Sequence, residues 1–109
     1  MHPARLVGPA LLLLSACASV EVGRPFDLAG FESNVQRGVT TQGEVRAWLG
    51  APAGVGMSVE STGERLEQWT YYHGEGRFPS MADARFKMLQ IKFGQRGVVH
   101  AYNWSGEAR

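Results

Sequence analysis

The hydrophobic residues of this chain follow three patterns in turn: a short continuous run, two stretches with helical spacing, and a long stretch of alternation. The continuous run, Leu6 to Leu14, is interrupted only by Gly8 and Pro9. A helix needs about 20 apolar residues to cross a bilayer, and this run is shorter. A short apolar run after a brief polar start is typical of a targeting segment that is removed from the mature protein.

The first helical stretch lies near the start of the remaining chain. Leu28, Phe31 and Val35 fall at positions i, i+3 and i+7, which places them on one face of a helix. Asp27 is suited to cap the start of this helix, and Gly38 is placed to end it.

The second helical stretch is better defined. Thr41 and Glu44 have the spacing of a capping box, in which each side chain bonds to the backbone of the other residue. Gly50 and Pro52 predict the end of the helix. The apolar face consists of Val45, Trp48 and Leu49.

After Pro52 the hydrophobic period changes toward two, which indicates β-strands. Glycine-bearing turns separate the strand candidates, and the segment 74–83, with two glycines and a proline, is the longest expected loop. The candidates are 55–60, 66–73, 86–93 and 98–104. We therefore predict an α+β fold in which two N-terminal helices pack on a three- to four-stranded antiparallel sheet, within one domain over residues 26–109.

The last two strand candidates are expected to form a hairpin. Gln95-Arg96-Gly97 suits a three-residue loop with Gly97 in the left-handed region, so that Phe93 opposes Val99. The same register, continued, places Leu89 and Ile91 with Val99 and Ala101 on one face. It places Gln90 and Lys92 with His100 and Tyr102 on the other face.

The end of the apolar run carries a specific signal. Leu14-Ser15-Ala16-Cys17 resembles the lipobox of bacterial lipoproteins, and Cys17 is the only cysteine of the chain. The resemblance implies a signal peptide over residues 1–16, a diacylglyceryl thioether on Cys17, and a short tether over residues 17–25. Ala18, where lipoproteins retained in the inner membrane commonly carry aspartate, favours the periplasmic face of the outer membrane. The alternative is a secreted protein whose single cysteine happens to follow its signal.

Composition and charge exclude several classes of function. The formal net charge of the 109 residues is +1, and loss of Arg5 with the signal peptide leaves the mature chain neutral, so nucleic-acid binding is not expected. No nucleophile motif is present, no cofactor is implied, and we expect no enzyme activity.

A metal site from His73, Glu75, Asp83 and His100 has no familiar ligand spacing. A small core without a disulfide also suggests structural roles for Trp48, Trp69 and Trp104.

A longer pattern carries a family resemblance. Gly38-Val39-Thr40-Thr41-x-x-Glu44-Val45-x-x-x-Leu49-Gly50-x-Pro52, followed by Trp69-x-Tyr71 and combined with the lipobox, resembles the BamE family, also called the SmpA/OmlA domain. The likeness covers roughly residues 28–99. It implies two helices on a three-stranded antiparallel sheet and an accessory lipoprotein of the outer-membrane β-barrel assembly machinery. Val39, where that family often carries methionine, and the short tether depart from its pattern.

The resemblance leads to a prediction of function. We expect a non-catalytic accessory or scaffold lipoprotein that acts in β-barrel assembly or envelope integrity and contacts components of the assembly machinery. Phe78 and Met81 in the long loop are the candidate partner-binding residues. Basic residues toward the C-terminus allow a patch that binds lipid headgroups or an acidic partner, but a solvated sheet face is the favoured interpretation. These residues are Arg77, Arg85, Lys87, Lys92 and Arg96. The alternatives are a stress-related envelope lipoprotein that binds peptide, lipid or peptidoglycan, and an enzyme-inhibitor-like binding module.

Overall fold

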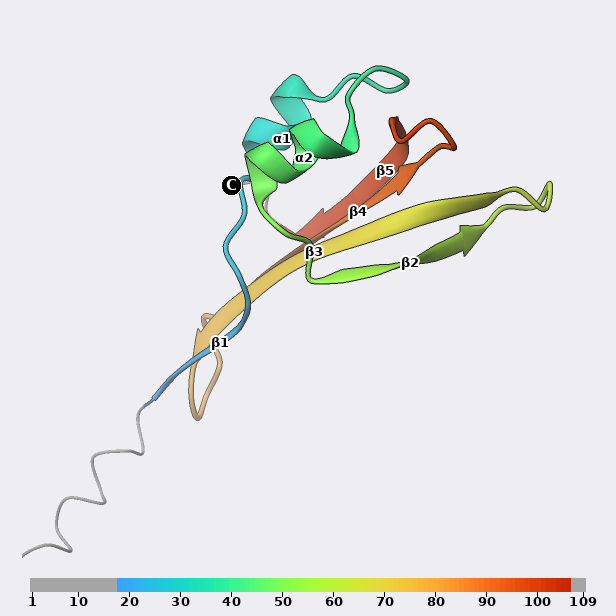
Figure 1. Ribbon diagram of the computed structural model, residues 1–109. Coiled ribbons are helices and arrows are strands. Elements are labelled where there is room, and N and C mark those ends of the chain that lie inside the picture. The colour runs from blue at the N-terminus through green and yellow to red at the C-terminus, as the bar shows by residue number, and fades with distance from the viewer. Residues whose placement is uncertain (1–17, 107–109) are drawn as a thin grey trace, which may run out of the picture.

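The computed structural model describes residues 18–106, which form two short helices and one antiparallel sheet (Figure 1). The elements, in chain order, are β1 (Ser19–Gly23), α1 (Leu28–Asn34), α2 (Gln42–Leu49), β2 (Gly54–Val59), β3 (Arg65–Arg77), β4 (Arg85–Phe93) and β5 (Val99–Gly106). Both helices lie over one face of the sheet, above β3, β4 and β5 (Figure 1).

The long strand β3 organises the sheet. One edge of β3 pairs with β4, which in turn pairs with β5. The other edge pairs with two strands placed end to end: β2 lies along residues 65–70 of β3, and β1 lies along residues 73–77. All of these pairings are antiparallel.

The predicted fold class is wrong. The sheet has five strands rather than three or four, and its first strand, β1, precedes the helices. Among residues 18–106, strand residues also dominate, at 48% against 17% helix. The segment expected to be a tether over residues 17–25 thus holds β1, in which Val20 and Val22 alternate with Ser19, Glu21 and Gly23. Its partner, β3, pairs with it at positions fifty or more residues away in the chain, so this short alternation gave no local sign of pairing.

The length of β3 also differs from the prediction. The strand was expected to end at residue 73 because Gly74 and Gly76 suggested a turn, but it continues through both glycines to Arg77. A Cβ on Gly74 would lie 2.9 Å from a ring carbon of Phe86, and one on Gly76 would lie 2.6 Å from the terminal methyl of Met81. These glycines therefore make room for side chains that cross the strand, a recognised role of glycine within a sheet.

The helices begin where the sequence predicts. The Asp27 carboxylate accepts a hydrogen bond from the Gly30 amide, at 3.0 Å. At the start of α2, both bonds of the capping box between Thr41 and Glu44 are present. Helix α1 ends earlier than expected, at Asn34, because the next residue, Val35, is already extended.

The core lies between the helices and the sheet. Trp69 and Phe93, on adjacent strands, pack edge to face with ring centroids 4.7 Å apart. The residues of the core cluster are Phe26, Leu28, Phe31, Val45, Leu49, Trp69, Tyr71, Leu89, Ile91, Phe93 and Val99. Trp69 is thus buried as expected, whereas Trp48 and Trp104 remain 38% and 40% exposed.

One hydrogen bond connects the end of α2 to the sheet. The Tyr71 hydroxyl donates to the Gly50 carbonyl at 2.8 Å. Gly50 caps the helix with a φ of 83°, a conformation that glycine adopts without strain. Burial raises the pKa of Tyr71 to about 12. The two parts of the pattern that resembles the BamE family, residues 38–52 and residues 69–71, are therefore in direct contact.

The β4–β5 hairpin has the predicted loop but a different continuation. Gly97 has a φ of 74°, the Gly97 amide donates to the Gly94 carbonyl at 2.9 Å, and Phe93 opposes Val99. Beyond that pair the register shifts, so that Ile91 opposes Tyr102 and Lys92 opposes Ala101. The predicted faces for Ala101 and Tyr102 are therefore wrong. The irregularity lets Tyr102 pack edge to face on Phe31 at 5.2 Å, which buries an aromatic ring that the regular register would leave on the polar face.

Candidate functional site

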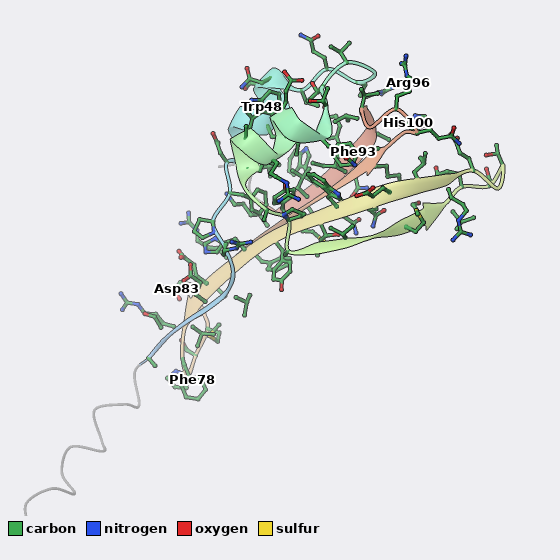
Figure 2. The ribbon with its side chains drawn as sticks, in the orientation of Figure 1. Trp48, Phe78, Asp83, Phe93, Arg96 and His100 are labelled. Carbon is green, nitrogen blue, oxygen red and sulfur yellow. The ribbon has the colours of Figure 1, made fainter. Side chains whose placement is uncertain are left out.

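The two residues predicted to bind a partner, Phe78 and Met81, lie in the loop between β3 and β4. Phe78 is at one end of the part of the chain that the structure describes (Figure 2). Phe78 is 54% exposed and Met81 is 36% exposed. The Phe78 amide donates to the carbonyl of Ala18 at 2.9 Å, so the loop lies beside the start of β1. The predicted lipidation site, Cys17, and the predicted signal peptide lie outside the described residues.

A second apolar surface, not singled out from the sequence, runs along β2. Val55, Met57 and Val59 are 63%, 57% and 62% exposed, and they alternate along the strand. Opposite them on β3 lie Trp69 and two charged residues. The outer edge of β2 pairs with no other strand within residues 18–106. We call this strand edge with its three apolar side chains the β2 edge.

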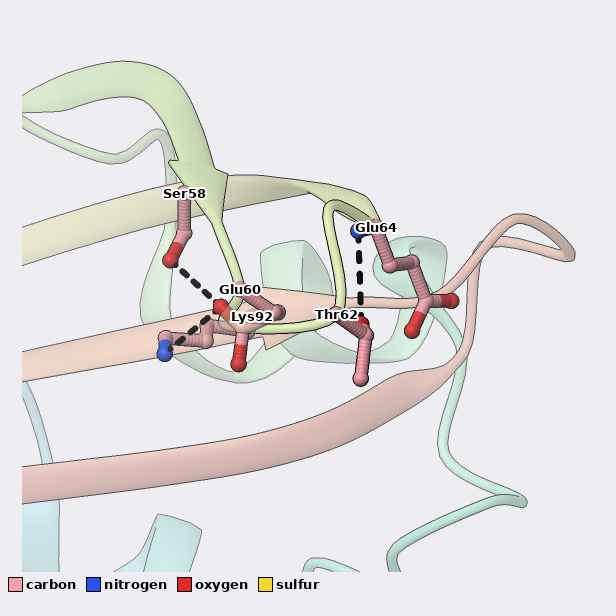
Figure 3. A network of polar contacts seen from close by, with 5 residues as sticks. All are labelled: Ser58, Glu60, Thr62, Glu64 and Lys92. Carbon is pink, nitrogen blue, oxygen red and sulfur yellow. Dashed lines mark hydrogen bonds and ion pairs between the residues drawn. The ribbon is translucent and has the colours of Figure 1, made fainter.

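A polar network holds the turn that follows the β2 edge (Figure 3). The Glu60 carboxylate accepts hydrogen bonds from the Ser58 hydroxyl at 2.7 Å and from the Lys92 ammonium at 3.1 Å. These bonds, led by that from Ser58, lower the pKa of Glu60 below its usual value. Because Lys92 belongs to β4, the network ties the end of β2 across β3 to the middle of the sheet.

Of the four residues considered as metal ligands, only His73 and Glu75 lie in one group of possible ligands. His73 and Glu75 lie near Glu21 of β1, with potential ligand atoms within 4.8 Å of one another. His100 lies at the opposite end of the molecule from Asp83 (Figure 2). His73 already contacts the Glu21 carboxylate at 2.7 Å, which accounts for the cluster as a pairing of β1 with β3.

The basic residues do not gather into one patch. Arg77 and Arg85 lie beside the loop that carries Phe78, whereas Arg96 lies in the β4–β5 turn at the other end of the sheet (Figure 2). Between them, the Lys87 ammonium donates to the Phe26 carbonyl at 2.7 Å and Lys92 pairs with Glu60. A continuous headgroup-binding surface along the C-terminal half is therefore not supported.

Comparisons with protein-family models, with curated proteins and with solved structures find no match to this chain. Across residues 18–106, neither helix has the length and apolar character required to cross a membrane. The strand pattern of residues 55–59 was visible in the sequence. Its exposure was not, because alternation alone does not show which face of a strand another layer covers.

Proposed function

We propose that this chain is a non-catalytic lipoprotein, anchored through Cys17 to the periplasmic face of the outer membrane, that assists the assembly of outer-membrane β-barrel proteins. The β2 edge is the single observation that carries the proposal. The lipobox and the resemblance to the BamE family support the location and the process.

The β2 edge has the chemistry of a strand-receiving site. An edge strand presents backbone N–H and C=O groups that another strand can bond, and natural proteins usually protect such edges with charges, prolines or a covering element. Residues 54–59, Gly-Val-Gly-Met-Ser-Val, contain neither a charged residue nor a proline. The part of the chain that the structure describes leaves this edge uncovered, so its backbone can pair with an extended segment of a partner.

The side chains of the β2 edge fit one class of partner. Transmembrane strands of β-barrels alternate apolar and polar residues, so an unassembled barrel strand carries an apolar row on one face. Such a strand, paired with β2, would set its apolar row beside Val55, Met57 and Val59. Backbone bonds would supply affinity, and the apolar row would favour strands with this alternation.

The test is photocrosslinking in intact cells from a photoreactive residue at Met57. We expect crosslinks to β-barrel proteins or to components of their assembly machinery. Val39, which is 61% exposed in the segment between the helices, is the matched control position. Equal recovery from both positions, or recovery of peptidoglycan or inner-membrane components alone, would contradict the proposal.

Anchoring is tested separately with the Cys17→Ser variant. We expect the parent to incorporate labelled palmitate and the variant to incorporate none, because only the thiol of Cys17 can form the thioether. Palmitate labelling of the variant at the level of the parent would rule out Cys17 as the anchor.

A further inference from the structure

A continuous apolar surface lies at the end of the molecule where β1 begins. It includes Val20 and Val22 of β1, Met81 and Ala84 of the loop, and Phe86 of β4. Val22 and Phe86 both lie opposite Gly74, on the sheet face that does not carry the helices. With Phe78 at the loop, we call these residues the tip.

The glycines of β3 give the tip its continuity. A Cβ on Gly74 would come within 2.9 Å of the Phe86 ring and 3.2 Å of a Val22 methyl group, so both side chains lie against bare backbone. Met81 covers Gly76 in the same way. Even so, Val22 and Phe86 are each 49% exposed. Val22, Phe86 and Met81 thus lie over the bare backbone of β3 at Gly74 and Gly76, while their outer surfaces remain open to the surroundings.

The position of Ala18, the first residue that the structure describes, indicates what covers this surface. The Phe78 amide is bonded to the carbonyl of Ala18, and the next residue toward the N-terminus is Cys17. Consecutive Cα atoms are 3.8 Å apart, so acyl chains on Cys17 would enter the bilayer next to the loop. We propose that the tip itself contacts the bilayer, so that this protein is held by protein side chains as well as by its acyl chains. This inference rests on the proposed anchoring at Cys17.

The charges near the tip favour an apolar rather than an electrostatic contact. Arg77 and Arg85 lie close to three carboxylates, those of Glu21, Glu75 and Asp83. This mixture does not attract anionic headgroups as a polybasic segment does. Phenylalanine and aliphatic side chains at a membrane surface instead bind by burial of apolar area. We therefore expect the tip to lie at the same depth in neutral and in anionic bilayers.

The experiment uses the full-length lipidated protein in vesicles. Because the thiol of the chain's only cysteine is consumed by lipidation, Ala82→Cys adds one free thiol for a spin label at the tip. Ser61→Cys places the control label in the β2–β3 turn, at the far end of β3. We expect accessibility of the label at position 82 to an aqueous relaxation reagent to be several-fold lower than at position 61. The difference should be equal in phosphatidylcholine vesicles with and without phosphatidylglycerol.

A second substitution tests the side chains themselves. Phe78→Asp, in the labelled Ala82→Cys protein, should raise the accessibility of the label toward that at position 61. Val39→Asp should leave it unchanged, because Val39 lies with the helices and away from the tip.

Each contrary outcome identifies what has failed. A lipidated protein whose tip label is as accessible as the control overturns the contact with the bilayer and leaves the anchor intact. Protection of the label at position 82 only in anionic vesicles would replace the apolar contact by headgroup recognition. Protection that increases with the protein-to-lipid ratio would replace it by contact with a second copy of the chain. Purified protein without the mass of the acyl chains overturns the anchor and the tip contact together.

Discussion

A few side chains connect parts of this protein that are distant in sequence. Tyr71 is the clearest example, because its ring lies in the core and its hydroxyl reaches the last turn of α2. The bonded group, the Gly50 carbonyl, belongs to a helix end, where carbonyls have no partner within the helix. Loss of the hydroxyl would therefore remove a bond that connects the helical layer to the sheet.

We predict that Tyr71→Phe lowers the free energy of unfolding by about 1 kcal/mol, the usual net contribution of one hydrogen bond. A tyrosine whose folded pKa is raised stabilises the fold fully below pH 10, and this contribution is lost as the pH rises toward about 12. The difference between parent and variant should therefore shrink over that range. Urea denaturation from pH 8 to pH 12 measures this difference, with Tyr102→Phe as the control. A constant difference across the range would show that the hydroxyl makes no protonation-dependent contribution.

Gly97 makes a backbone contribution of a different kind. Its φ of 74° lies in the left-handed region, whereas Gln95, two residues earlier, has no positive φ. We predict that Gly97→Val costs about 1 kcal/mol more than Gln95→Val, because a β-branched residue is strained at positive φ. Chemical denaturation of the two variants provides the measurement, and equal midpoints would contradict this account of the loop.

At the scale of elements, predictions succeeded where the signals were local. The capping box of α2 and the turn of the β4–β5 hairpin are each specified by a few adjacent residues, and both have the predicted geometry. The paths of β1 and β3 depend on contacts across the sheet. Gly74 and Gly76 suggested a turn. Their place within a strand is explained only by the side chains of Phe86 and Met81, which occupy the space that a Cβ on these glycines would fill. The β2 edge was missed for the same reason, since its exposure depends on how far the helices extend over the sheet.

The β2–β3 turn yields a prediction about pH. A glutamate whose folded pKa is lowered stabilises the fold above its unfolded value, near 4.5, and this contribution is lost as the pH falls through the folded value. We therefore expect Glu60→Gln to be less stable than the parent at neutral pH, with the difference shrinking below pH 4.5. Denaturation midpoints between pH 3 and pH 7 test this, with Glu64→Gln in the same turn as the control. A difference in midpoint between parent and variant that does not change with pH would show that Glu60 stabilises the fold through packing alone.

At the scale of the whole molecule, the two apolar surfaces lie at opposite ends of β3 (Figure 1). The strand rises about 3.4 Å per residue, so its thirteen residues span about 40 Å. With the tip at the bilayer, the β2 edge would lie in the periplasm, away from the headgroups. The short tether predicted for residues 17–25 would have kept the whole domain close to the lipid. The length of β3, which local patterns did not reveal, instead separates the proposed anchored end from the proposed binding edge.

The placement of β1 also determines how this domain would carry mechanical load. With the proposed anchor at Cys17, a partner held at the β2 edge would pull against the acyl chains, and that tension would enter the domain at the first residue of β1, beside Arg77. It acts along the axis of β1, opposite in direction to the force on the distal end of β3. The hydrogen bonds between Ser19–Gly23 and β3 are then loaded together in shear rather than broken one after another. The segment that follows the anchor would thus resist a pull by the partner as a clamp, where a free linker would simply extend.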